Sequence, residues 1–141
     1  MVPMDDGGTL PTDADVEAFL AAVTPARRRR DARTVCDLMT DVTGQQPVMW
    51  GSSIVGFGRQ SLRYASGREL DWMVVGFSPR KAATTLYLAG SWDEVREPLA
   101  RLGPHTTGAG CLYLKDVEAV DAGALREVVQ HTVDRAATAP G

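Results

Sequence analysis

The chain has 141 residues, of which 44% are hydrophobic and 23% are charged, and its formal net charge is −3. This length suits one domain that needs neither a metal nor a disulfide to bury an adequate core, and the composition excludes a disordered chain. The acidic net charge argues against long-range attraction to nucleic acid, so no nucleic-acid partner is expected.

The compartment is predicted from what the sequence lacks. No apolar run approaches the length of a membrane span, and the first residues lack the basic and apolar regions of a secretory signal. We therefore expect a cytoplasmic protein without a membrane partner. Cys36 and Cys111 are too few for a disulfide framework, and both are expected to be reduced thiols in the interior.

The N-terminal part predicts a tail over residues 1–11 and then two helices. Thr12 is a predicted N-cap for a short amphipathic helix, and Thr24 followed by Pro25 begins a second helix that ends at Gly44. The apolar stripes that support these helices are Val16, Phe19, Leu20 and Val23, then Val35, Leu38, Met39 and Val42.

The second predicted helix carries a run of arginines from Arg27 to Arg30, followed by Arg33. Successive residues point all round a helix, so the run cannot form one narrow binding face. We expect solvated arginines that lean on nearby acids, such as Asp31 and those of the first helix.

The central stretch changes to a strand-like pattern. Strands are predicted over Ile54–Tyr64, Trp72–Phe77 and Thr84–Leu88, and their short connections favour antiparallel neighbours. Gly56 and Gly76 lie inside two of these strands, each in a Val-Gly-Phe triplet. A glycine within a strand usually marks a bulge or a close approach of another group to the backbone.

The remaining elements complete an α+β prediction. A capping box at Ser91–Glu94 opens a helix that Pro98 divides, a fourth strand covers Cys111–Leu114, and Asp121 caps a final helix. The expected fold is one domain over residues 12–136, with an antiparallel meander of about four to five strands and the N- and C-terminal helices packed on one face. Residues 137–141 are expected to form a second tail.

Five motifs in order also carry a family resemblance. They are Pro47-Val-Met-Trp-Gly-Ser-Ser-Ile-Val-Gly-Phe-Gly58, Tyr64-Ala-Ser-Gly-Arg-Glu-Leu-Asp-Trp72, Val75-Gly-Phe-Ser-Pro-Arg-Lys81, Leu86-Tyr-Leu88 and Cys111-Leu-Tyr-Leu-Lys115. Together they resemble the YdhG-like family, a largely bacterial group of domains of unknown function with a frataxin-like member described as an iron chaperone. The resemblance spans about Val16 to Val129 and implies a small α+β domain of YdhG-like, frataxin-like type with iron binding or delivery as its one named role.

One loop departs from the family pattern. Relatives typically read Gly-Lys-His-Lys-Thr-Gly-Lys, whereas this chain has Gly103-Pro-His-Thr-Thr-Gly-Ala109 and so keeps the histidine without the three lysines. Backbone amides between Gly103 and Gly110 could still cradle an anion beside His105, or the segment is a tight turn into the fourth strand.

Residues 44–92 form the net-basic part of the chain, with two acids against five bases. Its cations, Arg59, Arg63, Arg68, Arg80 and Lys81, either converge on one site for a carboxylate or phosphate or are separately solvated, with Glu69 or Asp71 neutralising a neighbour. The candidate ligand-binding residues are Trp50, Trp72, Arg80, Lys81, His105 and Lys115.

For iron, the candidates are two pairs of carboxylates spaced four residues apart, Asp13 with Glu17 and Asp37 with Asp41. This spacing puts each pair on one helical face, although such faces are usually only solvated. The sequence has no Cys-x-x-Cys, His-x-x-x-His or Glu-x-x-His, which argues against a tight zinc or di-iron site.

No catalytic motif such as Gly-x-Ser-x-Gly occurs. The first functional hypothesis is a non-catalytic intracellular binding module, with iron handling as its family-derived form. The second is a ligand-binding or catalytic pocket for a small anion between the basic strands and the His105 loop. The third is a protein-interaction domain with an open sheet face, recognisable by an exposed apolar patch.

Overall fold

The computed structural model describes residues 10–63, 67 and 69–138, in which two helices precede a run of strands and further helices flank a last pair of strands. The helices are α1 (Val16–Ala21), α2 (Ala26–Thr43), α3 (Arg96–Leu102) and α4 (Ala122–Thr138), with short 3-10 helices η1 (Trp92–Val95) and η2 (Val117–Ala119). The strands are β1 (Val48–Trp50), β2 (Ile54–Phe57), β3 (Gln60–Arg63), β4 (Glu69–Trp72), β5 (Val75–Pro79), β6 (Thr84–Tyr87), β7 (Thr106–Gly108) and β8 (Cys111–Leu114).

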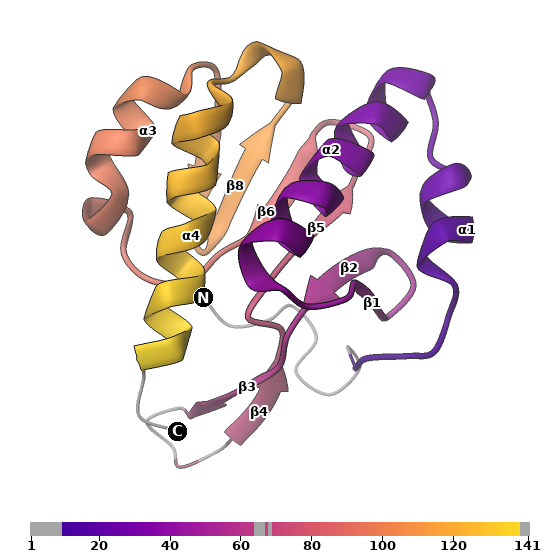
Figure 1. Cartoon of the computed structure of the whole chain (residues 1–141), viewed down its shortest axis with the longest axis horizontal. Helices are drawn as coiled ribbons and strands as arrows, with labels where there is room; N and C mark the ends of the chain where they lie inside the picture. The colour runs from indigo at the N-terminus through magenta and orange to yellow at the C-terminus, as the bar shows by residue number, and fades with distance from the viewer. Residues whose placement is uncertain (1–9, 64–66, 68, 139–141) are drawn as a thin grey trace.

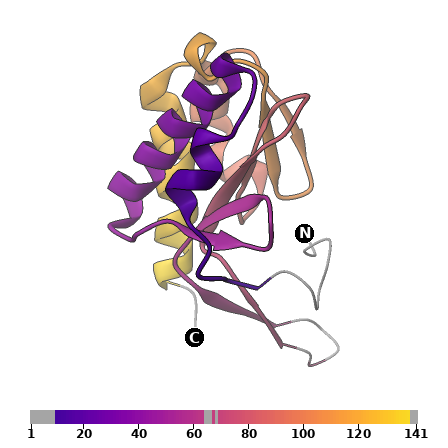
Figure 2. The same ribbon diagram turned by 90° about the vertical axis from the view of Figure 1, so that its right-hand side faces the viewer.

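Six strands form one antiparallel sheet in the order β1-β2-β5-β6-β8-β7, which confirms the predicted α+β class. Helices α2 and α4 lie side by side over one face of this sheet, and α1 and α3 flank them (Figures 1 and 2). Within the described residues, no helix is both long and apolar enough to span a membrane.

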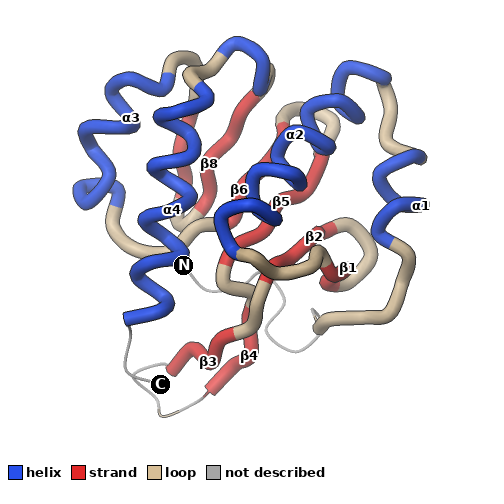
Figure 3. Tube along the Cα trace, viewed as in Figure 1, coloured by secondary structure: helices blue, strands red, loops and turns tan. Residues whose placement is uncertain are grey.

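The predicted strand count and simple meander were wrong. The run expected over Ile54–Tyr64 breaks at Gly58, whose φ of 71° turns the backbone, and the chain leaves the main sheet as the separate β3–β4 pair (Figure 3). Strands β1, β4 and β7 are additional, and β7 lies within the segment expected to be a loop.

The helix starts also needed correction. Asp15, not Thr12, caps α1 by accepting a hydrogen bond from the Ala18 amide, while the Thr12 amide donates to the Met49 carbonyl at the sheet edge. Helix α2 begins at Ala26 with Pro25 in the cap position, and it ends at Gly44 as predicted. Asp121 caps α4 through the Ala124 amide, also as predicted.

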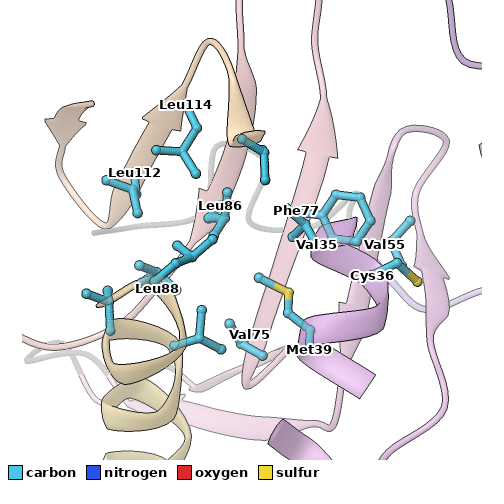
Figure 4. Close-up of a cluster of buried hydrophobic side chains, with 14 of the residues drawn as sticks. Val35, Cys36, Met39, Val55, Val75, Phe77, Leu86, Leu88, Leu112 and Leu114 are labelled. Atoms are coloured by element: carbon cyan, nitrogen blue, oxygen red, sulfur yellow. The ribbon is translucent and has the colours of Figure 1, made fainter. Parts of the chain in front are cut away.

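The core forms where alternate residues of the central strands meet the helices. Val55, Phe77 and Leu86 share the helix-facing side of the sheet because Val55 pairs with Phe77 and Phe77 with Leu86. Figure 4 shows these side chains gathered against Val35 and Met39 of α2, and all five are fully buried. The predicted apolar stripe of α2 is therefore confirmed as a core face.

The other face of the sheet is organised by a pair of glycines. Gly56 of β2 lies directly opposite Gly76 of β5, so two adjacent positions on this face have no side chain. The Trp50 indole occupies the space over Gly56, and the Met73 thioether occupies the space over Gly76. Of the two alternatives predicted at these glycines, a bulge or a close approach, the structure has the close approach, and it buries Trp50 to 2% exposure.

The arginines of α2 tie this helix to its neighbours. Arg28 and Asp31 form an ion pair with exposed fractions of 12% and 0%, and Asp31 also accepts from the Val117 amide. The other partners of the run are the Lys115 carbonyl and Asp116 for Arg27, the Lys115 carbonyl and the Thr84 hydroxyl for Arg28, the Val23 carbonyl for Arg29, Glu118 for Arg30 and Glu17 for Arg33. The predicted contacts with Asp31 and an acid of the first helix are confirmed.

Each edge of the main sheet makes hydrogen bonds to residues outside the sheet. At the β1 edge, Pro11 bridges Trp50 and the Gly51 amide donates to the Leu10 carbonyl. At the β7 edge, the Trp92 indole donates to the Gly108 carbonyl at 2.9 Å. These contacts remove hydrogen-bonding groups that an edge strand would otherwise offer to another chain.

Replacing Gly76 by alanine should destabilise the fold, because the new Cβ would lie 2.7 Å from the Val55 carbonyl oxygen and against the Met73 sulfur. Since a backbone oxygen cannot move without separating β2 from β5, we expect a loss of about 2 to 3 kcal/mol. Urea unfolding measures it, with Gly123→Ala in α4 as the control that should lose nothing. An unchanged midpoint for Gly76→Ala would contradict the packing of this face.

Replacing Asp31 by alanine leaves the Arg28 guanidinium without its carboxylate in a buried place. We expect a loss of about 3 kcal/mol in the free energy of unfolding, because breaking a buried pair strands the remaining charge. The matched control is Asp93→Ala, which removes an ion pair with Arg96 whose side chains are both 79% exposed and should change stability little. Equal losses of unfolding free energy in the two variants would contradict a stabilising role for the Arg28–Asp31 ion pair.

Candidate functional site

A row of three aromatic side chains crosses the face of the sheet opposite α2 and α4. Trp50 meets Trp72 edge-on with ring centroids 5.8 Å apart, and Trp72 meets Tyr87 edge-on at 6.4 Å. Such edge-to-face pairs contribute about 0.5 to 1.5 kcal/mol each beyond the area they bury. The row places Trp72, which is half-buried, between two buried rings.

A pocket of about 140 Å³ opens beside this row, and we call it the aromatic pocket. Its lining residues are Gln60, Trp72, Val74, Tyr87, Leu88, Ala89, Gly90 and Gly110. Two rings and several small or apolar groups give it an apolar interior. The Gln60 amide donates to the Met73 carbonyl at 3.1 Å, which holds that side chain in the wall.

Arg80 supplies positive charge at one side of the aromatic row. Its guanidinium donates to the Tyr87 hydroxyl oxygen at 3.1 Å, and among the described residues it has no carboxylate partner. Because the hydroxyl oxygen accepts from Arg80, its own proton is available to an acceptor. Tyr113 lies nearby on the neighbouring strand, and a hydrogen bond with the Cys111 thiol is the main cause of its raised pKa.

The structure does not bring the other basic candidates to the aromatic pocket. Lys81 is exposed in the turn between β5 and β6, and exposed Lys115 follows β8, where its carbonyl accepts from two arginines of α2. The pairing of Thr84 with Leu114 puts both lysines at the same end of the sheet. His105 precedes β7, and its Nδ1 lies 2.7 Å from the Gly103 carbonyl oxygen.

The glycine-rich segment around His105 forms the β7–β8 hairpin. Gly110 closes its turn with a φ of 75°, and the Tyr113 ring lies against Gly108. Of the two alternatives for this segment, the tight turn into the fourth strand is the one observed.

The predicted cluster of cations on the first strands is only partly present. Arg59 pairs with Asp71 at 2.7 Å, so this carboxylate neutralises a neighbour as expected. Tyr64, Arg68 and the side chain of Arg63 lie outside the described residues. Of the predicted ligand-binding set, the structure thus brings together Trp50, Trp72 and Arg80.

The carboxylates considered for iron lie apart from this site. Glu17 holds Arg33 through both oxygens, which lowers the pKa of its carboxyl group, and Asp41 pairs with Arg126 at 2.6 Å. Asp13 precedes α1, whereas Asp37 is exposed on α2. No group of three or more histidine, cysteine or acidic side chains within the described residues is arranged to hold a metal ion.

Sequence reasoning missed the central role of Tyr87. The alternation Leu86, Tyr87, Leu88 contained the signal, because the two leucines face the helices and the tyrosine must then face the other way. No pattern in the sequence predicts that Gln60 and Ala89 lie together. They line one pocket because β3 leaves the main sheet.

Comparisons of the chain with protein-family models, with curated proteins and with solved structures gave no match. The membership of the YdhG-like family that the motifs imply therefore stays a prediction.

Cys36 should be nearly inert in the folded protein, because burial raises its thiol pKa from 9.0 to about 11. At pH 8 a small thiol reagent should react with it at least about a hundredfold more slowly than in unfolded chains, measured in a Cys111→Ala background. The raised pKa stabilises the fold fully below pH 9, and this contribution is lost as the pH rises from 9 to 11. Equal reaction rates in both states would contradict the buried position of Cys36.

Proposed function

We propose that this protein is a binding module whose ligand is a small anion carrying a single planar ring. The ring lies in the aromatic pocket against Trp72 and Tyr87, and the anionic group binds Arg80. The observation that carries the proposal is a guanidinium with no carboxylate partner among the described residues, one hydrogen bond away from an aromatic pocket.

The dimensions of the pocket support a ligand with one ring. A cavity of about 150 Å³ lined by apolar side chains is known to hold benzene, and the aromatic pocket has about 140 Å³. Larger drug-sized ligands need about 300 Å³ or more. The faces and edges of Trp72 and Tyr87 are suited to a planar group, while aliphatic chains gain nothing from this geometry.

The chemistry of the lining supports binding and not catalysis. Tyr87 is the one titratable side chain among the residues that line the pocket, and its hydroxyl is engaged by Arg80. The residues that line the pocket include neither an activated nucleophile nor a carboxylate that could act as a base. The resemblance to the YdhG-like group, which has no agreed enzymatic activity, supports the same conclusion.

Other forms of a binding module have less support. The iron form lacks a cluster of ligands within the described residues, and two of its four carboxylates are held by arginines. An open sheet face for a protein partner would expose apolar side chains, yet Leu10 is the one large hydrophobic residue exposed in the described part of the chain.

The test is a titration of the protein with phenyl phosphate and benzoate, followed by calorimetry and by tryptophan fluorescence. We expect saturable binding that Arg80→Met weakens by about tenfold, because one charge-assisted contact is worth about 1.4 kcal/mol or more. Lys81→Met is the matched control, since it removes the neighbouring exposed cation without a contact to Tyr87. Binding of both anions should survive this control unchanged.

Two further ligands separate the ring from the charge. Inorganic phosphate, which has no ring, and benzyl alcohol, which has no charge, should each bind far more weakly than phenyl phosphate. Ala89→Phe should abolish binding by filling the pocket from its exposed rim. No binding by the parent protein, or equal losses in Arg80→Met and Lys81→Met, would refute the proposal.

A further inference from the structure

A second pocket lies on the helix side of the sheet, and we call it the helix-end pocket. Its volume is about 300 Å³. Its lining residues are Thr43, Gln45, Phe57, Gly58, Arg59, Gln60, Val74, Val133 and Ala136. It therefore lies where the C-terminal parts of α2 and α4 meet the turn that leads from β2 to β3.

The interior of the helix-end pocket is mainly aliphatic. Val74, Val133 and Ala136 contribute small saturated groups, and fully buried Phe57 supplies one ring. Partial exposure of the three aliphatic residues shows that this surface remains accessible to a ligand. Covering such a surface with hydrocarbon is favourable by about 25 cal/mol per Å².

The rim of the pocket is polar and contains one cation, Arg59. Its ion pair with Asp71 has a separation of 2.7 Å, but the two side chains are 55% and 49% exposed, respectively. An ion pair in contact with water contributes little to stability, so a ligand anion can share or replace Asp71 at modest cost. Thr43 ends α2, where free carbonyl groups disfavour an anion, and this assigns the anionic group to the Arg59 side.

We propose that the helix-end pocket binds a short aliphatic carboxylate. Its hydrocarbon chain covers Val74, Val133 and Ala136, and its carboxylate binds the Arg59 guanidinium through paired hydrogen bonds. The pocket volume is at the lower limit of pockets that bind small molecules. We therefore expect a ligand with a short hydrocarbon chain and not a long fatty acid.

This site is separate from the aromatic pocket, although Gln60 and Val74 contribute to both. None of the residues that line the aromatic pocket comes from α2 or α4, and Arg59 lines only the helix-end pocket. The two sites also differ in their preferred ligand, because one offers ring edges and the other saturated groups. The present inference therefore does not rest on the proposed ring-bearing anion.

The experiment is a titration of the protein with octanoate, followed by calorimetry and by amide shifts of Val133 and Ala136 in NMR spectra. Octanoate should bind saturably and shift these amides, whereas octanol should bind about tenfold more weakly because it lacks the charge. Ala136→Leu should abolish binding by filling the pocket, with Ala100→Leu on exposed α3 as the matched control.

Two charge substitutions give opposite expected results. Arg59→Met should weaken octanoate binding about tenfold, and Asp71→Asn should strengthen it by removing the competing carboxylate. A merely structural ion pair would make the two variants behave alike. Absence of octanoate binding, or the same direction of change in both variants, would overturn the proposal. Arg80→Met should leave octanoate binding unchanged, which distinguishes this site from the aromatic pocket.

Discussion

The pairing of Gly56 with Gly76 is the constraint on which the face opposite the helices depends. A side chain at either position would occupy the space now filled by Trp50 or Met73. With Trp50 displaced, Trp72 would lose the ring against which its edge packs, and Tyr87 would lose its position beside Trp72 in turn. The position of the rings in the wall of the aromatic pocket therefore depends on two adjacent residues without side chains. This explains why a glycine occurs within each of these two strands.

How far the sequence predicts this arrangement differs between its parts. Glycine inside two strands predicted a bulge or a close approach to the backbone. The apolar stripes predicted the core faces of the helices, because these residues repeat with the helical period. Strands β1 and β7 have three residues each, too few for a period to be visible. Of the residues chosen from the sequence, Trp50, Trp72 and Arg80 lie in one row with Tyr87, whereas Lys81, Lys115 and His105 lie elsewhere. Their contacts depend on the register of distant strands, which local patterns do not contain.

The uneven charge of the chain has a structural meaning. Residues 1–43 carry eight acids against five bases, and the arginines of α2 bind Glu17 and Asp31 within this part and Asp116, Glu118 and the Lys115 carbonyl beyond it. In the basic centre, Asp71 neutralises Arg59 only at the surface, and Arg80 has a tyrosine as its partner. Elsewhere Arg96, Arg101 and Arg126 form ion pairs in which the arginine side chains are 79%, 42% and 50% exposed, so the arginines of the centre differ in their partners and not in their burial. Since exposed ion pairs contribute little to stability, exchanging Asp71 for another anion at Arg59 costs little.

The two pockets meet at a wall whose properties decide whether their occupants can influence each other. Val74 is fixed by the bond from its amide to the Phe57 carbonyl, so its contribution to both pockets is set by the backbone. The Gln60 backbone is held by its pairing with Trp72 in the β3–β4 pair, and its side chain lines both pockets while donating to the Met73 carbonyl. Coupling between the sites requires a group with two arrangements that each ligand favours unequally. Gln60 and Val74 are each held by a hydrogen bond to a backbone carbonyl, so coupling between the two pockets would require breaking one of these bonds.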